Sequence, residues 1–66
     1  MQVKLNGEAR EIPDGLTVAG LLEHLGIKAQ RVAVELNEAV VTKDRYASQA
    51  VGPGDAIEVV AFVGGG

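Results

Sequence analysis

Hydrophobic and polar residues alternate in two stretches of this chain, residues 2–5 and 32–36. Alternation is typical of a strand with one buried face, since successive side chains point to opposite sides of a sheet. In the second stretch the pattern places Val32, Val34 and Leu36 on the core side. Two further strands are expected without clear alternation. They are the fragment Val40-Val41 and the mostly apolar run 56–63.

The dipeptide Asn6-Gly7 directly follows the first strand and predicts a tight hairpin. A two-residue type I′ turn needs positive φ at both central positions, which Asn followed by Gly tolerates best. Residues 8–12 should return as a second, more polar strand at an exposed position of the sheet. Pro13-Asp14-Gly15 then ends that strand. We interpret this hairpin as scaffold.

A short amphipathic helix is predicted for residues 18–25. Thr17 is a suitable N-cap, and Gly26 is placed to end the helix in the left-handed conformation. Gly20 lowers helix propensity by about 1 kcal/mol relative to alanine. A glycine here would let the helix lie close to a sheet, or it is a neutral substitution that the fold tolerates. His24 has no evident nucleophile or second titrating partner, so we interpret it as a surface side chain. The apolar face comprises Val18, Leu21, Leu22 and Leu25.

The segment 42–48 is polar around Tyr46 and suits a loop or a single helical turn. We expect Tyr46, the only tyrosine, to anchor this segment on the core rather than to bind a ligand. The charged residues around it should form a solvated rim. A tight turn at residues 51–55 leads into the last strand. The order of elements predicts an α+β fold in which one face of a sheet packs on the helix.

The last strand carries apolar residues on both of its faces. Glu58 indicates which face of this strand is exposed. If its carboxylate points to solvent, Val60 and Phe62 point the same way, because every second residue lies on the same side of a strand. Two exposed apolar residues at successive outward positions beside a chain end suggest a docking patch for a partner. In the competing interpretation there is no docking patch. The strand is then either central and covered by a loop, or its side chains alternate the other way, so that Val60 and Phe62 point inward. The residues expected to face the helix are Ile57, Val59, Ala61 and Val63.

Three glycines, Gly64, Gly65 and Gly66, follow the last strand. We expect a flexible tail over residues 64–66 that ends in a free carboxylate, because glycine loses the most freedom on ordering. Fully extended, the tail reaches roughly 10 Å and has no side chain to block its entry into a narrow channel. Ordering it costs roughly 3–6 kcal/mol. Burying two large apolar side chains stabilises a complex by about 1.5–3 kcal/mol each, which offsets the cost of ordering the tail. The domain formed by residues 1–63 should therefore supply the binding energy.

Composition excludes several functional classes. A chain of 66 residues is one domain near the lower limit for folding alone, and 47% hydrophobic residues supply its core. Without cysteine, and with one histidine, it has no disulfide and no evident metal site. A net charge of −3 argues against nucleic-acid binding. The absence of a signal peptide and of a long apolar run leads us to expect a cytoplasmic protein.

The chemistry open to a terminal carboxylate requires activation. Reaction with ATP gives an acyl-adenylate, from which a sulfur nucleophile displaces AMP and leaves a thiocarboxylate, whereas an amine would give an amide. This chain has no phosphate-binding loop and no nucleophile–base pair. We therefore expect a carrier and co-substrate that binds no cofactor itself, while an activating partner binds ATP and Mg²⁺.

Several segments together resemble the sulfur carrier proteins of thiamine biosynthesis, the ThiS family. They are Asn6-Gly7, residues 18–22, residues 32–37, Gly54-Asp55 and Val63-Gly64-Gly65-Gly66. The resemblance covers essentially the whole chain and implies a ubiquitin-like β-grasp fold, with a mixed sheet of four to five strands on one helix. It also implies that an E1-like enzyme adenylates Gly66, that a sulfur-donor protein supplies the sulfur, and that thiazole synthase receives it.

Three other interpretations stay open at this point. The small subunit of molybdopterin synthase shares the fold, the ending and the activation, although such chains are usually longer. A ubiquitin-like modifier would join its terminal carboxylate to lysines of other proteins. A non-covalent binding module would carry an inert tail.

Overall fold

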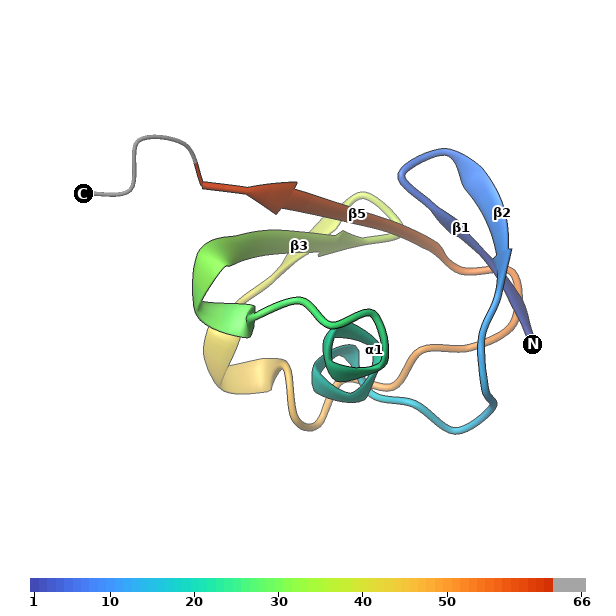
Figure 1. Cartoon of the computed structure of the whole chain (residues 1–66), viewed down its shortest axis with the longest axis horizontal. Helices are drawn as coiled ribbons and strands as arrows, with labels where there is room; N and C mark the ends of the chain where they lie inside the picture. The colour runs from blue at the N-terminus through green and yellow to red at the C-terminus, as the bar shows by residue number, and fades with distance from the viewer. Residues whose placement is uncertain (63–66) are drawn as a thin grey trace.

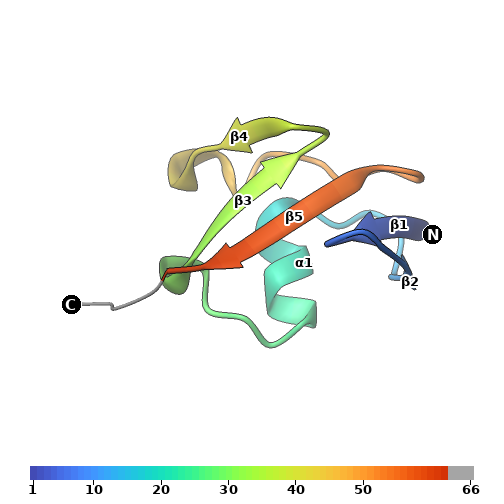
Figure 2. The same cartoon turned by 90° about the horizontal axis from the view of Figure 1, so that it is seen from above.

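The computed structural model describes residues 1–62, in which a five-stranded mixed sheet packs against one helix (Figures 1 and 2). The elements are β1 (Gln2–Leu5), β2 (Glu8–Glu11), α1 (Val18–His24), the 3₁₀ turn η1 (Ala29–Arg31), β3 (Val32–Leu36), β4 (Ala39–Val41), the 3₁₀ turn η2 (Lys43–Arg45) and β5 (Ala56–Ala61). The predicted α+β fold is confirmed. No helix in this part of the chain has the length and hydropathy needed to cross a membrane.

The last strand, β5, lies in the middle of the sheet, whose strand order is β2-β1-β5-β3-β4 (Figure 2). It runs parallel to β1 over a short register, from Lys4↔Ala56 to Leu5↔Ile57. Its antiparallel pairing with β3 is longer and extends to Val32↔Ala61. The far half of β5 therefore has a neighbouring strand on one side only.

Both hairpins use two-residue turns with positive φ. Asn6 and Gly7 have φ values of 50° and 84°, which confirms the predicted type I′ turn between β1 and β2. Asn37 and Glu38, with φ values of 51° and 70°, make the same kind of turn between β3 and β4. This conformation costs a non-glycine residue such as Glu38 roughly 1–2 kcal/mol.

The helix begins as predicted and ends one residue earlier. Thr17 is the N-cap, and its hydroxyl accepts a hydrogen bond from the Gly20 N–H at 3.1 Å. Leu25 is the C-cap, and Gly26 follows with φ 73°. A Cβ at Gly20 would lie 3.3 Å from Cδ2 of Leu16, in the segment that precedes the helix. Gly20 thus gives no sign of a close approach between helix and sheet.

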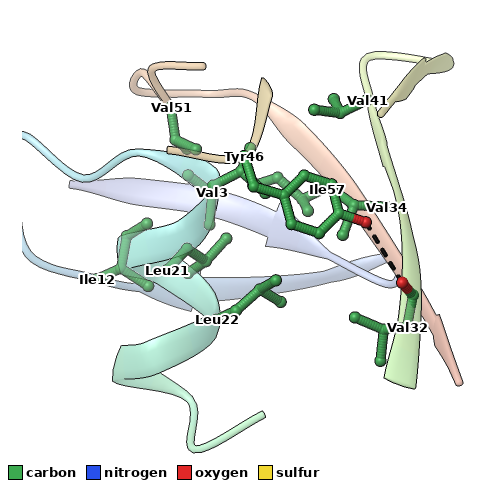
Figure 3. Close-up of a cluster of buried hydrophobic side chains, with 11 residues drawn as sticks. Val3, Ile12, Leu21, Leu22, Val32, Val34, Val41, Tyr46, Val51 and Ile57 are labelled. Atoms are coloured by element: carbon green, nitrogen blue, oxygen red, sulfur yellow. Dashed lines mark hydrogen bonds between the residues drawn. The ribbon is translucent and has the colours of Figure 1, made fainter. Parts of the chain in front are cut away.

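The core lies between the helix and the inner face of the sheet (Figure 3). Tyr46 is only 4% exposed, and its hydroxyl donates a hydrogen bond of 3.3 Å to the carbonyl of Val32. Its predicted role as an anchor is confirmed. The buried residues are Val3, Ile12, Val18, Leu21, Leu22, Val32, Val34, Val41, Tyr46, Val51 and Ile57.

The predicted phase of β5 is confirmed, but burial stops earlier than expected. Ile57 is buried and Glu58 is exposed. Ala61 was expected to face the helix, yet it is exposed. The strand extends past α1 at its end, so α1 does not cover the inward side there (Figure 2). Alternation predicts the side to which a residue points, whereas burial also requires a packing partner there.

Candidate functional site

The candidate site has two parts, the outward face at the end of β5 and the glycine tail beyond it. Val63 and the tail residues Gly64, Gly65 and Gly66 lie outside the described residues, so their predicted roles and the domain boundary at residue 63 stay predictions. The outward face is described in full. It lies on the side of the sheet opposite α1 (Figure 1).

The apolar surface consists of Val60 and Phe62, called the β5 patch below. These side chains are 58% and 55% exposed, which confirms that the second face of β5 is uncovered within residues 1–62. Val60 lies opposite the exposed Ala33 of β3 in the sheet register. The Phe62 N–H donates to the carbonyl of Arg31 at 2.9 Å, so backbone pairing holds the patch up to Phe62.

A third large apolar side chain on this face, Val40, is 72% exposed but belongs to the edge strand β4. In the sheet register Val40 lies opposite Glu35, which in turn lies opposite Glu58. Two carboxylates thus share its row across the sheet. The carboxylates of Glu35 and Glu58 separate Val40 from the β5 patch. Val40 is therefore a suitable control for substitutions in the patch, since it is an exposed valine on the same face but outside the patch.

Lys43 borders the β5 patch, a position that the sequence did not suggest. Its Nζ lies 5.1 Å from the centroid of the Phe62 ring and donates a 2.9 Å hydrogen bond to the carbonyl of Gln30. A cation over an aromatic face at an exposed site contributes about 0.5–1 kcal/mol. Lys43 is exposed, as predicted for the charged residues around Tyr46. The structure adds that its positive charge lies beside the patch.

Asn6 also reaches the last strand, in addition to its predicted place in the hairpin turn. Its side-chain Oδ1 accepts a hydrogen bond from the Val59 N–H at 2.8 Å. No local pattern signals this contact, because the two residues are far apart in the sequence. It places a side chain of the first hairpin next to the residue that precedes the β5 patch.

The α-amino group of Met1 is held at the opposite end of the sheet from the end of β5 (Figure 1). It lies 2.9 Å from Asp14 Oδ1 and 3.0 Å from Glu11 Oε2, and it donates a 2.6 Å hydrogen bond to the carbonyl of Ile12. The hydrogen bonds to the Asp14 and Glu11 side chains raise the pKa of this amine above its usual 8.0. This cluster stabilises the link between β2 and α1 and has no contact with the patch.

Comparison with known proteins places these features in a family. A family model described as the ThiS family matches residues 3–66, which is nearly the whole chain. The chain belongs to the ThiS family. The resemblance inferred from the sequence is confirmed.

ThiS proteins of similar length support the same assignment. The sulfur carrier protein ThiS of Thermus thermophilus is 39% identical over 64 residues, covering 97% of this chain and 98% of that protein. The ThiS crystal structure from Geobacter metallireducens superposes with a TM-score of 0.86 at 35% identity, covering 100% of both chains. The five-stranded sheet on one helix is therefore the ubiquitin-like β-grasp fold of ThiS.

Two longer relatives contain a segment similar to this ThiS chain. A thiazole synthase of Paramagnetospirillum magneticum is 47% identical over 66 residues, and one of Magnetococcus marinus is 46% identical. In each case the match covers 100% of this chain but 20% of the relative. The chain thus spans about a fifth of the length of these two relatives.

Proposed function

We propose that this protein is a sulfur carrier of thiamine biosynthesis, a co-substrate rather than an enzyme. The observation that carries the proposal is the match to the ThiS family over residues 3–66, together with the shared fold at a TM-score of 0.86. Proteins of matching length in the comparison bear the name sulfur carrier protein ThiS.

The proposed reaction takes place at the carboxylate of Gly66. A carboxylate oxygen attacks the α-phosphate of ATP, pyrophosphate leaves, and an acyl-adenylate forms. A persulfide sulfur of a donor protein then attacks the acyl carbon and displaces AMP, which gives an acyl disulfide. A thiol cleaves the S–S bond, so that the carrier leaves as a thiocarboxylate and the donor as a disulfide. An E1-like adenylating enzyme binds the ATP and Mg²⁺ for this step, while Gly64 and Gly65 form the narrow arm that enters its active site. The proposal requires that Gly66 is the last residue of the mature protein.

Thiazole synthase is the proposed acceptor of the sulfur. The two relatives named thiazole synthase include a segment that is 46–47% identical to this whole chain. A carrier segment within a synthase supports the view that the two act on the same sulfur atom. This observation favours the thiamine pathway over the molybdopterin alternative. We place the reaction in the cytoplasm.

The β5 patch is the proposed docking surface for these partners. Val60 and Phe62 are exposed shortly before the tail. Pairing with β3 holds Val60, and a backbone hydrogen bond to Arg31 of η1 holds Phe62. Burying the exposed parts of two apolar side chains supplies binding energy that a glycine tail lacks. The globular part therefore binds the partner, and the tail follows into the active site.

Intact-mass spectrometry tests the proposal. The purified chain ending at Gly66 is incubated with ATP, Mg²⁺, an adenylating enzyme of the thiamine pathway, a persulfide donor and a thiol reductant. We expect a mass change equal to the exchange of one oxygen for sulfur, and transfer of that sulfur when thiazole synthase and its substrates are added. A chain with one residue added after Gly66 is the control and should stay unmodified.

The other outcomes separate the alternatives. Slower-migrating covalent conjugates would identify a protein modifier. A thiocarboxylate that supplies sulfur to a molybdopterin precursor but not to thiazole synthase would assign the chain to the other pathway. The same measurement on protein isolated from its own cells shows whether the mature chain ends at Gly66.

A further inference from the structure

The two edges of β5 end their pairing at different points. On the β3 side, backbone contact continues to Val32↔Ala61 and to the hydrogen bond from the Phe62 N–H to the carbonyl of Arg31. On the β1 side, the last backbone contact is the hydrogen bond from the Asn6 N–H to the carbonyl of Ile57, at 2.8 Å. The described part of β1 does not pair with β5 beyond that point.

The side chain of Asn6 extends this pairing by one step. The chain turns away at Asn6, where φ is 50°. The side-chain amide still reaches β5, since Oδ1 accepts from the Val59 N–H at 2.8 Å and Nδ2 donates to the Val59 carbonyl at 3.3 Å. An amide offers one acceptor and a donor side by side, which is what a neighbouring strand would present. Asn6 thus takes the place of the next residue of β1.

This contact is the last support of β5 on the β1 side before the β5 patch. Backbone groups along a strand point alternately to either neighbour, so Ile57, Val59 and Ala61 direct theirs toward the β1 side. Ile57 is paired with β1, Val59 is bound by Asn6, and Ala61 lies beyond both. Without the Asn6 amide, the β3 side would be the only edge holding the strand from Val59 onward.

We propose that Asn6 is a positioning residue for the adenylation reaction. By holding Val59 from the β1 side, its amide keeps the end of β5 in one orientation, so that the β5 patch and the tail can meet the activating enzyme together. This inference rests on the proposed function. It assigns to the first hairpin a role in presenting the tail, beyond its role as scaffold.

Asn37 provides a matched control at the start of the same strand. Its Oδ1 accepts from the Ala56 N–H at 3.0 Å, and its Nδ2 donates to Asp55 Oδ1 at 3.1 Å. Like Asn6, it is exposed and occupies the first position of a two-residue turn, with φ 51°. Removal of either side chain costs two hydrogen bonds, but only Asn6 acts next to the β5 patch.

The experiment compares Asn6→Gly with Asn37→Gly in steady-state pyrophosphate release, with the carrier as the varied substrate. ATP, the persulfide donor and a thiol reductant are saturating, so that the acyl-adenylate is consumed and the enzyme turns over. Glycine tolerates the positive φ at both positions, so the side chain is removed without backbone strain. For Asn6→Gly we expect KM for the carrier to rise about tenfold, with little change in kcat. A tenfold change corresponds to about 1.4 kcal/mol, which is within the range expected for the loss of its two hydrogen bonds to Val59. For Asn37→Gly we expect a KM within about twofold of the wild-type value. Its thermal stability should fall as much as that of Asn6→Gly, because both variants lose two hydrogen bonds.

Two further measurements separate positioning from general destabilisation. Amide hydrogen exchange should accelerate at Val59 in Asn6→Gly but not in Asn37→Gly. The variant Asn6→Asp keeps the acceptor for the Val59 N–H and loses the donor, so its KM should lie between those of the wild type and Asn6→Gly. It also provides a second variant if Asn6→Gly does not fold.

The inference is overturned if Asn6→Gly exchanges faster at Val59 while its KM stays at the wild-type value, or if Asn37→Gly raises KM equally. An increase in KM without faster exchange at Val59 would equally refute it. If the adenylating enzyme does not act on the wild-type chain at all, the proposed function itself fails. The two failures are therefore distinguishable.

Discussion

Truncation of Phe62 is the most direct test of the β5 patch. An aromatic side chain buries about 200 Å², and Phe62 is 55% exposed, so a partner could cover about 110 Å² more. At about 25 cal/mol per Å², this area corresponds to roughly 2.7 kcal/mol, or an affinity loss of up to about a hundredfold for Phe62→Ala. For Val60→Ala we expect a smaller loss, about fivefold, because the side chain is smaller.

The assay is calorimetric titration of the adenylating enzyme with each folded variant. Phe62 lies outside the buried core, so circular dichroism of Phe62→Ala should match that of the wild type. Val40→Ala is the matched control for Val60→Ala, since Val40 is more exposed and belongs to the edge strand β4. Its affinity should not change. The reasoning is refuted if Phe62→Ala binds as tightly as the wild type, or if the two valine variants lose affinity equally.

Three predictions concern stability. Tyr46→Phe removes the buried hydrogen bond to Val32 and should lower the free energy of unfolding by about 1 kcal/mol in urea titrations; an unchanged midpoint would show that the 3.3 Å bond contributes nothing. Glu38→Gly relieves a φ of 70° and should raise that free energy by about 1 kcal/mol, whereas Glu8→Gly, in strand β2, should lower it; a loss in both would contradict the strain argument. Because the pKa of the Met1 amine is raised, its contacts stabilise the fold fully below about pH 8, and this stability is lost as pH rises through the raised pKa. The urea midpoint of a chain with a free amine should therefore fall in alkaline solution, and a fall of equal size after acetylation of the amine would contradict this.

Local sequence determined most elements of this protein. Asn6-Gly7 predicted a type I′ turn because the conformation depends on those two residues alone. Thr17 predicted the start of α1, since an N-cap binds a backbone group within the next turn. Glu58 predicted the phase of β5, because side chains along a strand alternate regardless of what surrounds them.

The tertiary structure alone decided how the end of β5 is held and what borders the patch. Ala61 is exposed because the strand extends past α1, and Lys43 lies over Phe62 because the turn after β4 reaches the end of β5. Asn6 contacts Val59 because the first and last strands are parallel neighbours in the sheet. Such contacts join residues that are far apart in the chain, so they follow from strand order and register. No local pattern of hydrophobic and polar residues carries that information.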